Sequence, residues 1–227
     1  MEPDFPPDPD SLPNVISVFP LAAPLLLPGT AVPLFIAEPQ YRTLIEDALE
    51  ADSHIGVLQP TETSDEEAVG EPGPADSALY SVGCLGYIGE FRDEGPDESV
   101  ALVGGVIRFR VVRELPPIHG YRRVEVDYQE FLDDLADVEE GLQFPALRDV
   151  VRQRIESNQT GLDLSIMDGM EGTEIVTAIA HALPFSAAER QVLMETPSLR
   201  ELEELLLQLM AGPGGVPHFD LRPLLPS

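Results

Sequence analysis

The chain has 227 residues, with 41 acidic against 13 basic side chains, and its formal charge is −28. So large a negative charge repels phosphate backbones and anionic lipid surfaces, which argues against nucleic-acid binding as the main function. All 13 basic residues are arginine, which excludes a P-loop lysine, a Ser–Lys dyad and a Schiff base to pyridoxal phosphate.

The acidity has two interpretations. It keeps a cytoplasmic protein soluble, which we favour, or it forms an acidic surface that docks basic or unfolded chains. The single cysteine, Cys84, has apolar neighbours, and we expect it to be a buried thiol in a reducing compartment. Both observations favour a cytoplasmic location.

The first part of the chain predicts two buried strands. Residues 1–11 are rich in Pro and Asp and are expected to be disordered. No charged residue follows until position 38, but four prolines between positions 20 and 33 exclude a membrane-spanning helix. The acidic residues ahead of this run do not fit a secretion signal. We therefore expect a pair of short strands hinged at residues 27–30, with Pro28-Gly29 in a type II turn.

An amphipathic helix is predicted next, from Pro39 to about residue 50. Proline suits a first helical position, and the preceding Glu38 suits a helix N-terminus. The helical spacing of apolar residues is met by Tyr41, Leu44, Ile45, Ala48 and Leu49. A strand over residues 54–60 and a mobile acidic loop over residues 61–76 follow.

Three further strands complete the predicted β domain, which spans residues 12–129. Residues 79–91 and 99–112 are apolar and are joined by a polar Gly-Pro turn, so they predict a hairpin. Gly104-Gly105 indicates a bulge or bend. Residues 121–128 alternate apolar and charged positions, as a strand with one solvated face does. A small barrel is the expected arrangement.

The remainder predicts helices, so the fold class is α+β. An acidic linker is expected at residues 130–144, a helical bundle at 145–211 and a proline-rich tail at 212–227. Ser186 with Glu189 and Ser198 with Glu201 both fit the capping box that opens a helix.

No catalytic, metal-binding or cofactor-binding constellation is found in the sequence. The four histidines lie in four different segments, without a second His or Cys at metal-ligand spacing. There is no GxSxG motif, and the glycine-rich stretches lack phosphate-binding spacing. We expect no enzyme activity and no cofactor.

The order of the segments resembles the Lon substrate-binding domain, the N-terminal module of ATP-dependent Lon proteases. The resemblance covers residues 12–211 and is carried by "VFPLAAPLLLPGTAVPLFIAEPQYRTLIEDAL", "VGCLGYIGEF", "GVIRFRVVREL" and the leucine pattern of the last helices. It implies a PUA-like pseudo-barrel followed by helices. The resemblance does not extend to the ATPase and peptidase domains of a Lon protease. It therefore implies a recognition module without those catalytic domains.

Four residues that match the family motif are expected to be structural: Glu38, Tyr41, Arg42 and Arg108. They would cap the helix start and tie the helix to the barrel by ion pairs. In particular, Arg42 or Arg108 would hold the carboxylate of Glu38 with a fork-shaped pair of hydrogen bonds.

The residues expected to bind a partner are exposed apolar side chains on the barrel, with Phe35, Tyr87 and Phe91 as candidates.

We rank three functional hypotheses. The first is a non-catalytic module that binds unfolded or specific client proteins, with a protease or ATPase as a further partner, and with neither nucleic acid nor membrane as a ligand. The second is a PUA-like nucleic-acid or nucleotide binder, and the third is an unrecognised hydrolase.

Overall fold

A computed structural model describes residues 7–61, 70, 77–93, 95, 99–135, 145–149, 152 and 185–211. The chain divides into two compact units, Met1–Ala136 and Asp137–Ser227, and each is described by itself. The predicted proline-rich tail lies outside the described residues, as do most of the acidic loop, the end of the acidic linker and the middle of the predicted bundle.

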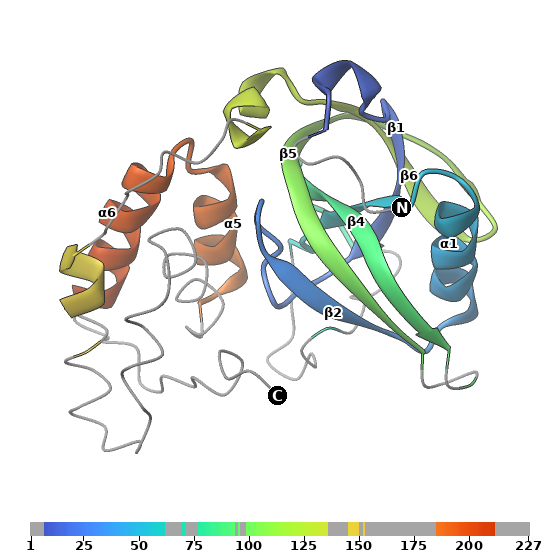
Figure 1. Ribbon diagram of the computed structural model, residues 1–227, viewed down its shortest axis with the longest axis horizontal. Helices are drawn as coiled ribbons and strands as arrows, with labels where there is room; N and C mark the ends of the chain where they lie inside the picture. Colours follow the sequence, from blue (N-terminus) through green and yellow to red (C-terminus); the bar gives the residue numbers. More distant parts are fainter. Residues whose placement is uncertain are drawn as a thin grey trace. The chain divides into compact units, whose positions relative to one another are not determined.

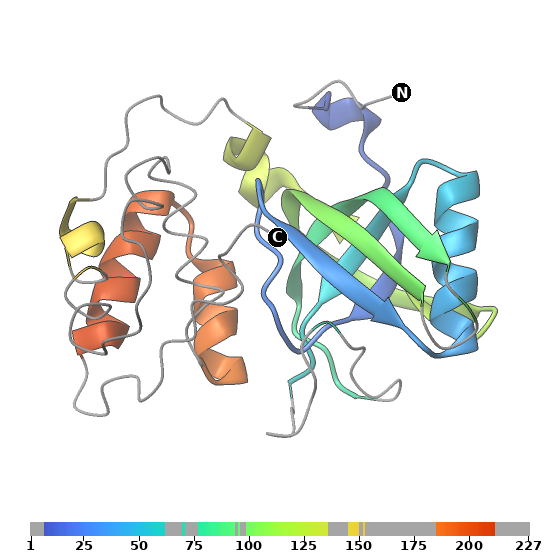
Figure 2. The ribbon, with the colours of Figure 1, turned by 60° about the horizontal axis from the view of Figure 1, so that its bottom comes forward.

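The first unit is built on one six-stranded mixed sheet (Figures 1 and 2). Its strands are β1 (Val15–Pro20), β2 (Ala31–Ile36), β3 (His54–Leu58), β4 (Val82–Asp93), β5 (Ser99–Ile118) and β6 (Tyr121–Asp127). The strand order is β2-β5-β4-β3-β1-β6, and β5 also pairs with β6. Every pair is antiparallel except β1 with β3, which is parallel.

The two strands predicted in the uncharged run both form, but their predicted pairing is wrong. Strand β1 pairs with β3 and β6, whereas β2 pairs with β5. The turn between them is as expected: the Thr30 N–H donates to the Leu27 carbonyl at 3.1 Å, and Gly29 has a φ of 76°. Residues 21–30 connect two strands that pair with different neighbours. The turn sequence therefore predicted a turn correctly but not a hairpin.

The predicted hairpin is confirmed as β4 and β5, which pair over most of β4. Their register shifts where Leu85 faces Ile107 and Gly86 faces Gly105, which agrees with the bend expected at Gly104-Gly105. A Cβ on Gly105 would lie 2.2 Å from the Leu27 carbonyl oxygen. Glycine is therefore required where the turn at residues 27–30 packs against β5.

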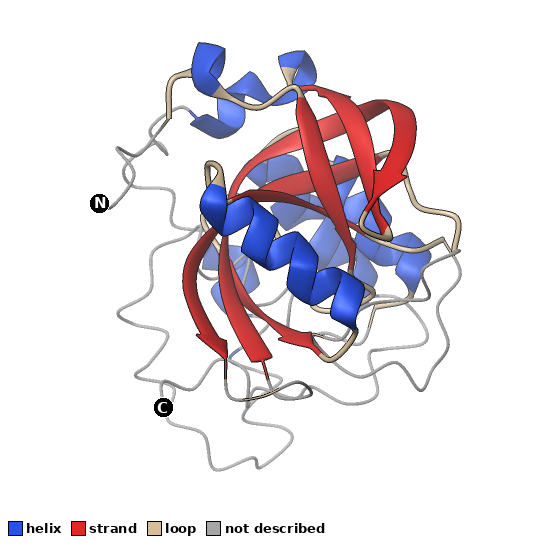
Figure 3. Cartoon of the chain, turned by 90° about the vertical axis from the view of Figure 1, so that its right-hand side faces the viewer, coloured by secondary structure: helices blue, strands red, loops and turns tan. Residues whose placement is uncertain are grey.

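Helix α1 (Pro39–Glu50) begins with proline at its first position, as predicted. Figure 3 shows the helix in front of the strongly curved sheet, with strands on both sides of it. Its buried face consists of Tyr41, Leu44, Ile45 and Ala48. Leu49, which we expected on that face, is 39% exposed. Successive residues turn by about 100° around a helix, so the residue after Ala48 lies at the margin of the apolar stripe.

Two short 3-10 helices precede and follow the strands in sequence. Each forms in a segment that we had expected to lie outside the β domain. Helix η1 (Pro9–Ser11) forms in the segment that we expected to be disordered, with Asp8 as its N-cap. Helix η2 (Gln129–Leu135) occupies the start of the expected acidic linker, with Phe131 and Leu135 buried. Both apolar side chains explain why this part of the acidic segment is ordered.

In the second unit the structure describes α5 (Ala187–Glu195) and α6 (Leu199–Ala211). The capping box at Ser186 and Glu189 is confirmed with both of its hydrogen bonds. Ser198 accepts a hydrogen bond from the Glu201 N–H at 3.3 Å, which is one half of the second box. A helical bundle over residues 145–211 stays a prediction.

Candidate functional site

The exposed side of strand β2 and of the first half of β5 is apolar. Direct partners across the two strands are Phe35 with Val100, Pro33 with Leu102, and Ala31 with Gly104. We call the side chains of Ala31, Pro33, Phe35, Val100 and Leu102 the β2–β5 face. Phe35 is 44% exposed and Leu102 is 42% exposed. They are diagonal neighbours across the pair, a distance that long side chains bridge.

The same strands are mainly apolar on their other side, where they form the core, with Ser99 as the buried polar residue at the start of β5. Val32, Leu34 and Ile36 of β2 alternate with the exposed positions and are buried. On β5, Ala101 and Val103 are also buried. Because side chains alternate along a strand, the core positions determine which residues must face outward.

Strand β4 borders the β2–β5 face with polar groups. In its pairing with β5, Glu90 lies opposite Leu102 and Arg92 lies opposite Val100. The Arg92 Nε donates to the Glu90 carboxylate at 2.8 Å. Tyr87 lies opposite Gly104 and is half-buried, with its ring 5.6 Å from the ring of His54.

The three predicted partner-binding residues do not share one side of the sheet. Phe35 and Tyr87 lie on the exposed side. Phe91 lies opposite Ala101, which is buried and faces Leu34 on β2. Phe91 is therefore on the core side of the strand, half-buried at its end. The register shift between Ile88 and Glu90 puts Phe91 there, and the sequence alternation alone did not reveal it.

The outward edge of β2 is closed to further strands by two features. Pro33 has no N–H to offer, and the Phe35 N–H donates to the Gly70 carbonyl at 2.8 Å. The Gly70 N–H in turn donates to the Ala23 carbonyl at 2.7 Å. A Cβ on Gly70 would lie 2.6 Å from the Phe35 ring. Binding by this region would therefore use the face of the strand and not its edge.

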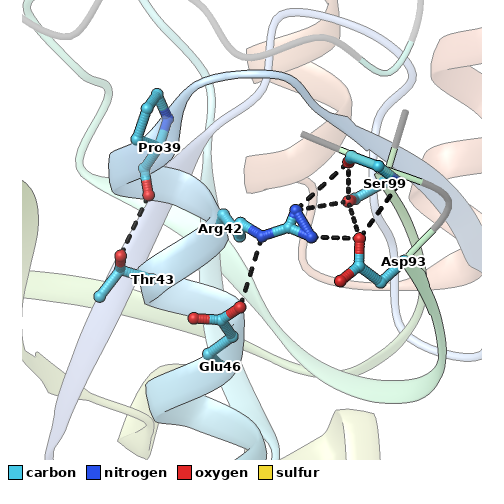
Figure 4. A network of polar contacts seen from close by, with 7 residues as sticks. Pro39, Arg42, Thr43, Glu46, Asp93 and Ser99 are labelled. Carbon is cyan, nitrogen blue, oxygen red and sulfur yellow. Dashed lines mark hydrogen bonds and ion pairs between the residues drawn. The ribbon is translucent and has the colours of Figure 1, made fainter. Parts of the chain in front are cut away.

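Arg42 joins helix α1 to the end of the β4–β5 hairpin (Figure 4). Its guanidinium forms ion pairs with Asp93 and with Glu46, and it donates to the Gly95 carbonyl and the Ser99 hydroxyl. The Arg42 guanidinium, with hydrogen bonds from Ser99 and Gly95, holds the pKa of Asp93 below its usual value.

Glu38 is not the carboxylate that either arginine holds, so that prediction is wrong. Its carboxylate accepts from the Gln40 amide at 2.8 Å and makes no side-chain cap, although its carbonyl accepts from the Tyr41 and Arg42 N–H groups. Tyr41 is buried with its ring 5.0 Å from Phe19, and burial, followed by the negative charge of Glu38, raises the pKa of Tyr41 to about 12.

Arg108 instead holds Asp134 of η2. Its Nε and Nη2 donate to the two carboxylate oxygens at 2.9 and 2.6 Å, and its backbone N–H donates at 3.0 Å. The two side chains are 8% and 9% exposed, and the guanidinium lies 4.9 Å from the Phe131 ring centre. Asp134 lies within the acidic linker expected at residues 130–144, and the composition of that segment did not distinguish this buried carboxylate from its neighbours.

Metal ligands and the cysteine thiol are among the reactive groups that bear on catalysis. Among them no three His, Cys, Asp or Glu residues are grouped so that they could hold a metal ion. The Cys84 thiol is buried, and burial raises its pKa above the usual value, which keeps it protonated and unreactive. Within the ranges that the structure describes, no helix has the length and apolarity needed to span a membrane.

The sequence model of the substrate-binding domain of ATP-dependent protease La (LON) matches residues 15–212. Lon protease 2 of Myxococcus xanthus is 28% identical over 213 residues, and Lon protease of Anaeromyxobacter dehalogenans is 26% identical. These alignments cover 88% of this chain but only 24% and 23% of the relatives, so the chain spans about a quarter of the length of the curated relatives it matches.

Two solved structures have the same fold. The Lon N-terminal domain protein of Xanthomonas campestris has a TM-score of 0.57 and 24% identity, with 85% of this chain and 97% of that chain covered. The N-terminal domain of a Lon protease from the Mycobacterium avium complex has a TM-score of 0.60 and 16% identity, with coverage of 88% and 99%. With the family match over residues 15–212, these findings establish that the chain belongs to the Lon substrate-binding domain family.

Proposed function

We propose that this chain is a non-catalytic protein-recognition module that binds polypeptide segments through the β2–β5 face. The observation that carries the proposal is the exposure of Phe35 and Leu102 as diagonal neighbours on paired strands. A strand side that faces water normally carries polar residues. Contiguous apolar side chains on such a surface are typical of sites that bind other proteins.

The energetics suit a weak and adaptable binding site. Burying an apolar side chain contributes about 1.5–3 kcal/mol when it goes from full exposure to full burial. Phe35 and Leu102 are each less than half exposed, so together they supply a few kcal/mol at most. Such a face suits unfolded segments that are captured and released, and it does not suit a permanent assembly.

The fold that we propose for this function is a PUA-like pseudo-barrel followed by a C-terminal helical bundle. The pairing of β5 with both β4 and β6 supports a sheet that returns on itself. We place the protein in the cytoplasm, with unfolded or specific client proteins as ligands and a protease or ATPase as the partner that receives them. The matched relatives are named as proteases; delivery of clients for proteolysis is a proposal for this chain.

Suppression of aggregation tests the proposal. Light scattering of a heat-denatured client should fall when the full chain is added in slight excess, and Phe35→Ser should lose most of this effect because the face loses its largest apolar group. Val112→Ser is the matched control: Val112 is 59% exposed on the other half of β5. Equal activity of the two variants, or no suppression by the wild type, would count against the proposal.

A further inference from the structure

We infer that the β2–β5 face selects segments in which apolar side chains are flanked by lysine or arginine. The inference rests on the proposed function and adds the charge of the ligand to it. It follows from the net charge of the unit that carries the face, which is strongly negative.

The unit that contains the face has far more carboxylates than cations. Residues 1–136 contain 26 acidic side chains and seven arginines. Six of those arginines, all within the described ranges, already form ion pairs with carboxylates: Arg42, Arg92, Arg108, Arg110, Arg113 and Arg122. The cations are thus largely matched, and the surplus charge of this unit is negative.

Two segments that adjoin described residues of the face are acidic in sequence. By sequence, the residues that join β4 to β5 contain Glu94, Asp97 and Glu98 and no basic residue. The strands end there, next to the pair formed by Phe35 and Val100. At the β2 edge, the residue bonded to Phe35 is Gly70, which belongs to the acidic segment 61–76.

The charged residues of β4 beside the face do not add a net positive charge. Arg92 is the described cation beside the face, and Glu90 lies 2.8 Å from it, so the two charges offset each other. The apolar centre and its surroundings therefore differ in what they offer. The centre supplies affinity by burial, and the net negative charge of the unit attracts cationic flanks and repels acidic ones.

A peptide titration measures this selectivity directly. Four labelled peptides are compared by fluorescence anisotropy: one apolar core with Lys/Arg flanks, with Gly/Ser flanks, or with Asp/Glu flanks, and a Gly/Ser core with Lys/Arg flanks. At about 50 mM NaCl we expect the cationic apolar peptide to bind about tenfold tighter than the neutral one, and the acidic one not to bind. At about 500 mM NaCl the cationic advantage should shrink to about threefold or less, because salt screens the attraction.

Two pairs of variants locate the effect. Leu102→Ser should weaken the cationic apolar peptide strongly, whereas Val112→Ser on the same strand should not. Glu90→Gln should weaken it by about two- to fourfold, because the variant removes one carboxylate beside the face. Glu125→Gln, which removes a carboxylate paired with Arg113 on a different part of the sheet, is its control.

The outcomes separate the two proposals. Equal binding of the cationic, neutral and acidic apolar peptides would overturn charge selection and leave polypeptide binding intact. Equal binding of the two cationic peptides, with and without an apolar core, would overturn the inference as well, since the face would then contribute nothing. If no apolar peptide binds at either salt concentration, the proposed function itself fails.

Discussion

Strands β2 and β6 lie in the same sheet and each buries one side, yet their exposed sides differ. On β6 the outward positions opposite β1 are Arg123 and Glu125, and Glu125 pairs with Arg113 at 2.5 Å. On β2 the outward positions are Ala31, Pro33 and Phe35. A solvated side needs nothing apolar to hold the fold together, as β6 demonstrates. The exposed Phe35 is the difference between the two strands on which the proposed binding role rests.

The largest expected loss of stability comes from breaking a buried ion pair of β5, which we compare with an exposed ion pair of the same strand. Arg108→Met leaves the carboxylate of Asp134 buried without its partner, and we expect the free energy of unfolding to fall by about 3–5 kcal/mol. Arg113→Met breaks the exposed pair with Glu125, and it should cost about 1 kcal/mol or less. Urea denaturation followed by circular dichroism measures both, and similar losses would contradict the burial argument.

Two adjacent residues compare the two sides of β2. Leu34→Ala should lower the free energy of unfolding by about 2–5 kcal/mol, because Leu34 is fully buried. Phe35→Ala should lower it by about 1 kcal/mol and should remove most client binding. If Phe35→Ala destabilises the chain as much as Leu34→Ala does, Phe35 is part of the core and the contrast with β6 is lost.

A glycine pair tests what closes the β2 edge. Gly70 and Gly29 have φ of 84° and 76°, so alanine at either should cost about 1–2 kcal/mol in strain. A Cβ on Gly29 meets nothing within 4 Å, whereas one on Gly70 meets Phe35. Only Gly70→Ala should speed hydrogen exchange of the Phe35 amide. Unchanged exchange in that variant would contradict the role given to Gly70.

The smallest effect concerns the Arg42 network at the end of the hairpin. Arg42 holds the pKa of Asp93 below its usual value, so the ionised form is favoured in the folded state. This contribution is present above the unfolded-state pKa of about 3.9 and is lost as the pH falls below it. The stability of Asp93→Asn should therefore fall less steeply than that of the wild type below about pH 5. Parallel curves from denaturation at several pH values would contradict the assigned cause.

In the first unit, the positions of the strands and of the helix could be predicted from the sequence, whereas several of their pairing partners could not. Proline, glycine and alternation located all six strands and the start of α1, because these signals are local. The pairing of β1 and β2 was wrong because it depends on contacts with strands far away in the chain. The partner of Arg108 was missed for the same reason, since Asp134 lies 26 residues away in sequence.

The candidate site was anticipated in part. Phe35 and Tyr87 were recognised as aromatic residues on strands, and the structure places both on the exposed side. Leu102 was not singled out, although its alternation with Ala101 and Val103 could have indicated it once the hairpin was predicted. Phe91 was also a candidate exposed residue, but a bulge that shifts the alternation by one residue places it half-buried on the core side, and such a bulge has no reliable sequence signal here.

Photo-crosslinking tests the central claim most directly, because it reports where a polypeptide touches this chain. A cationic apolar peptide with a diazirine side chain is irradiated with the wild-type protein, and the modified residues are located by mass spectrometry. The account predicts crosslinks in β2 and in the first half of β5, around Phe35 and Leu102, and none near Val15 or Val112. Crosslinks concentrated on β6, on the second half of β5 or in α5 and α6 would contradict it.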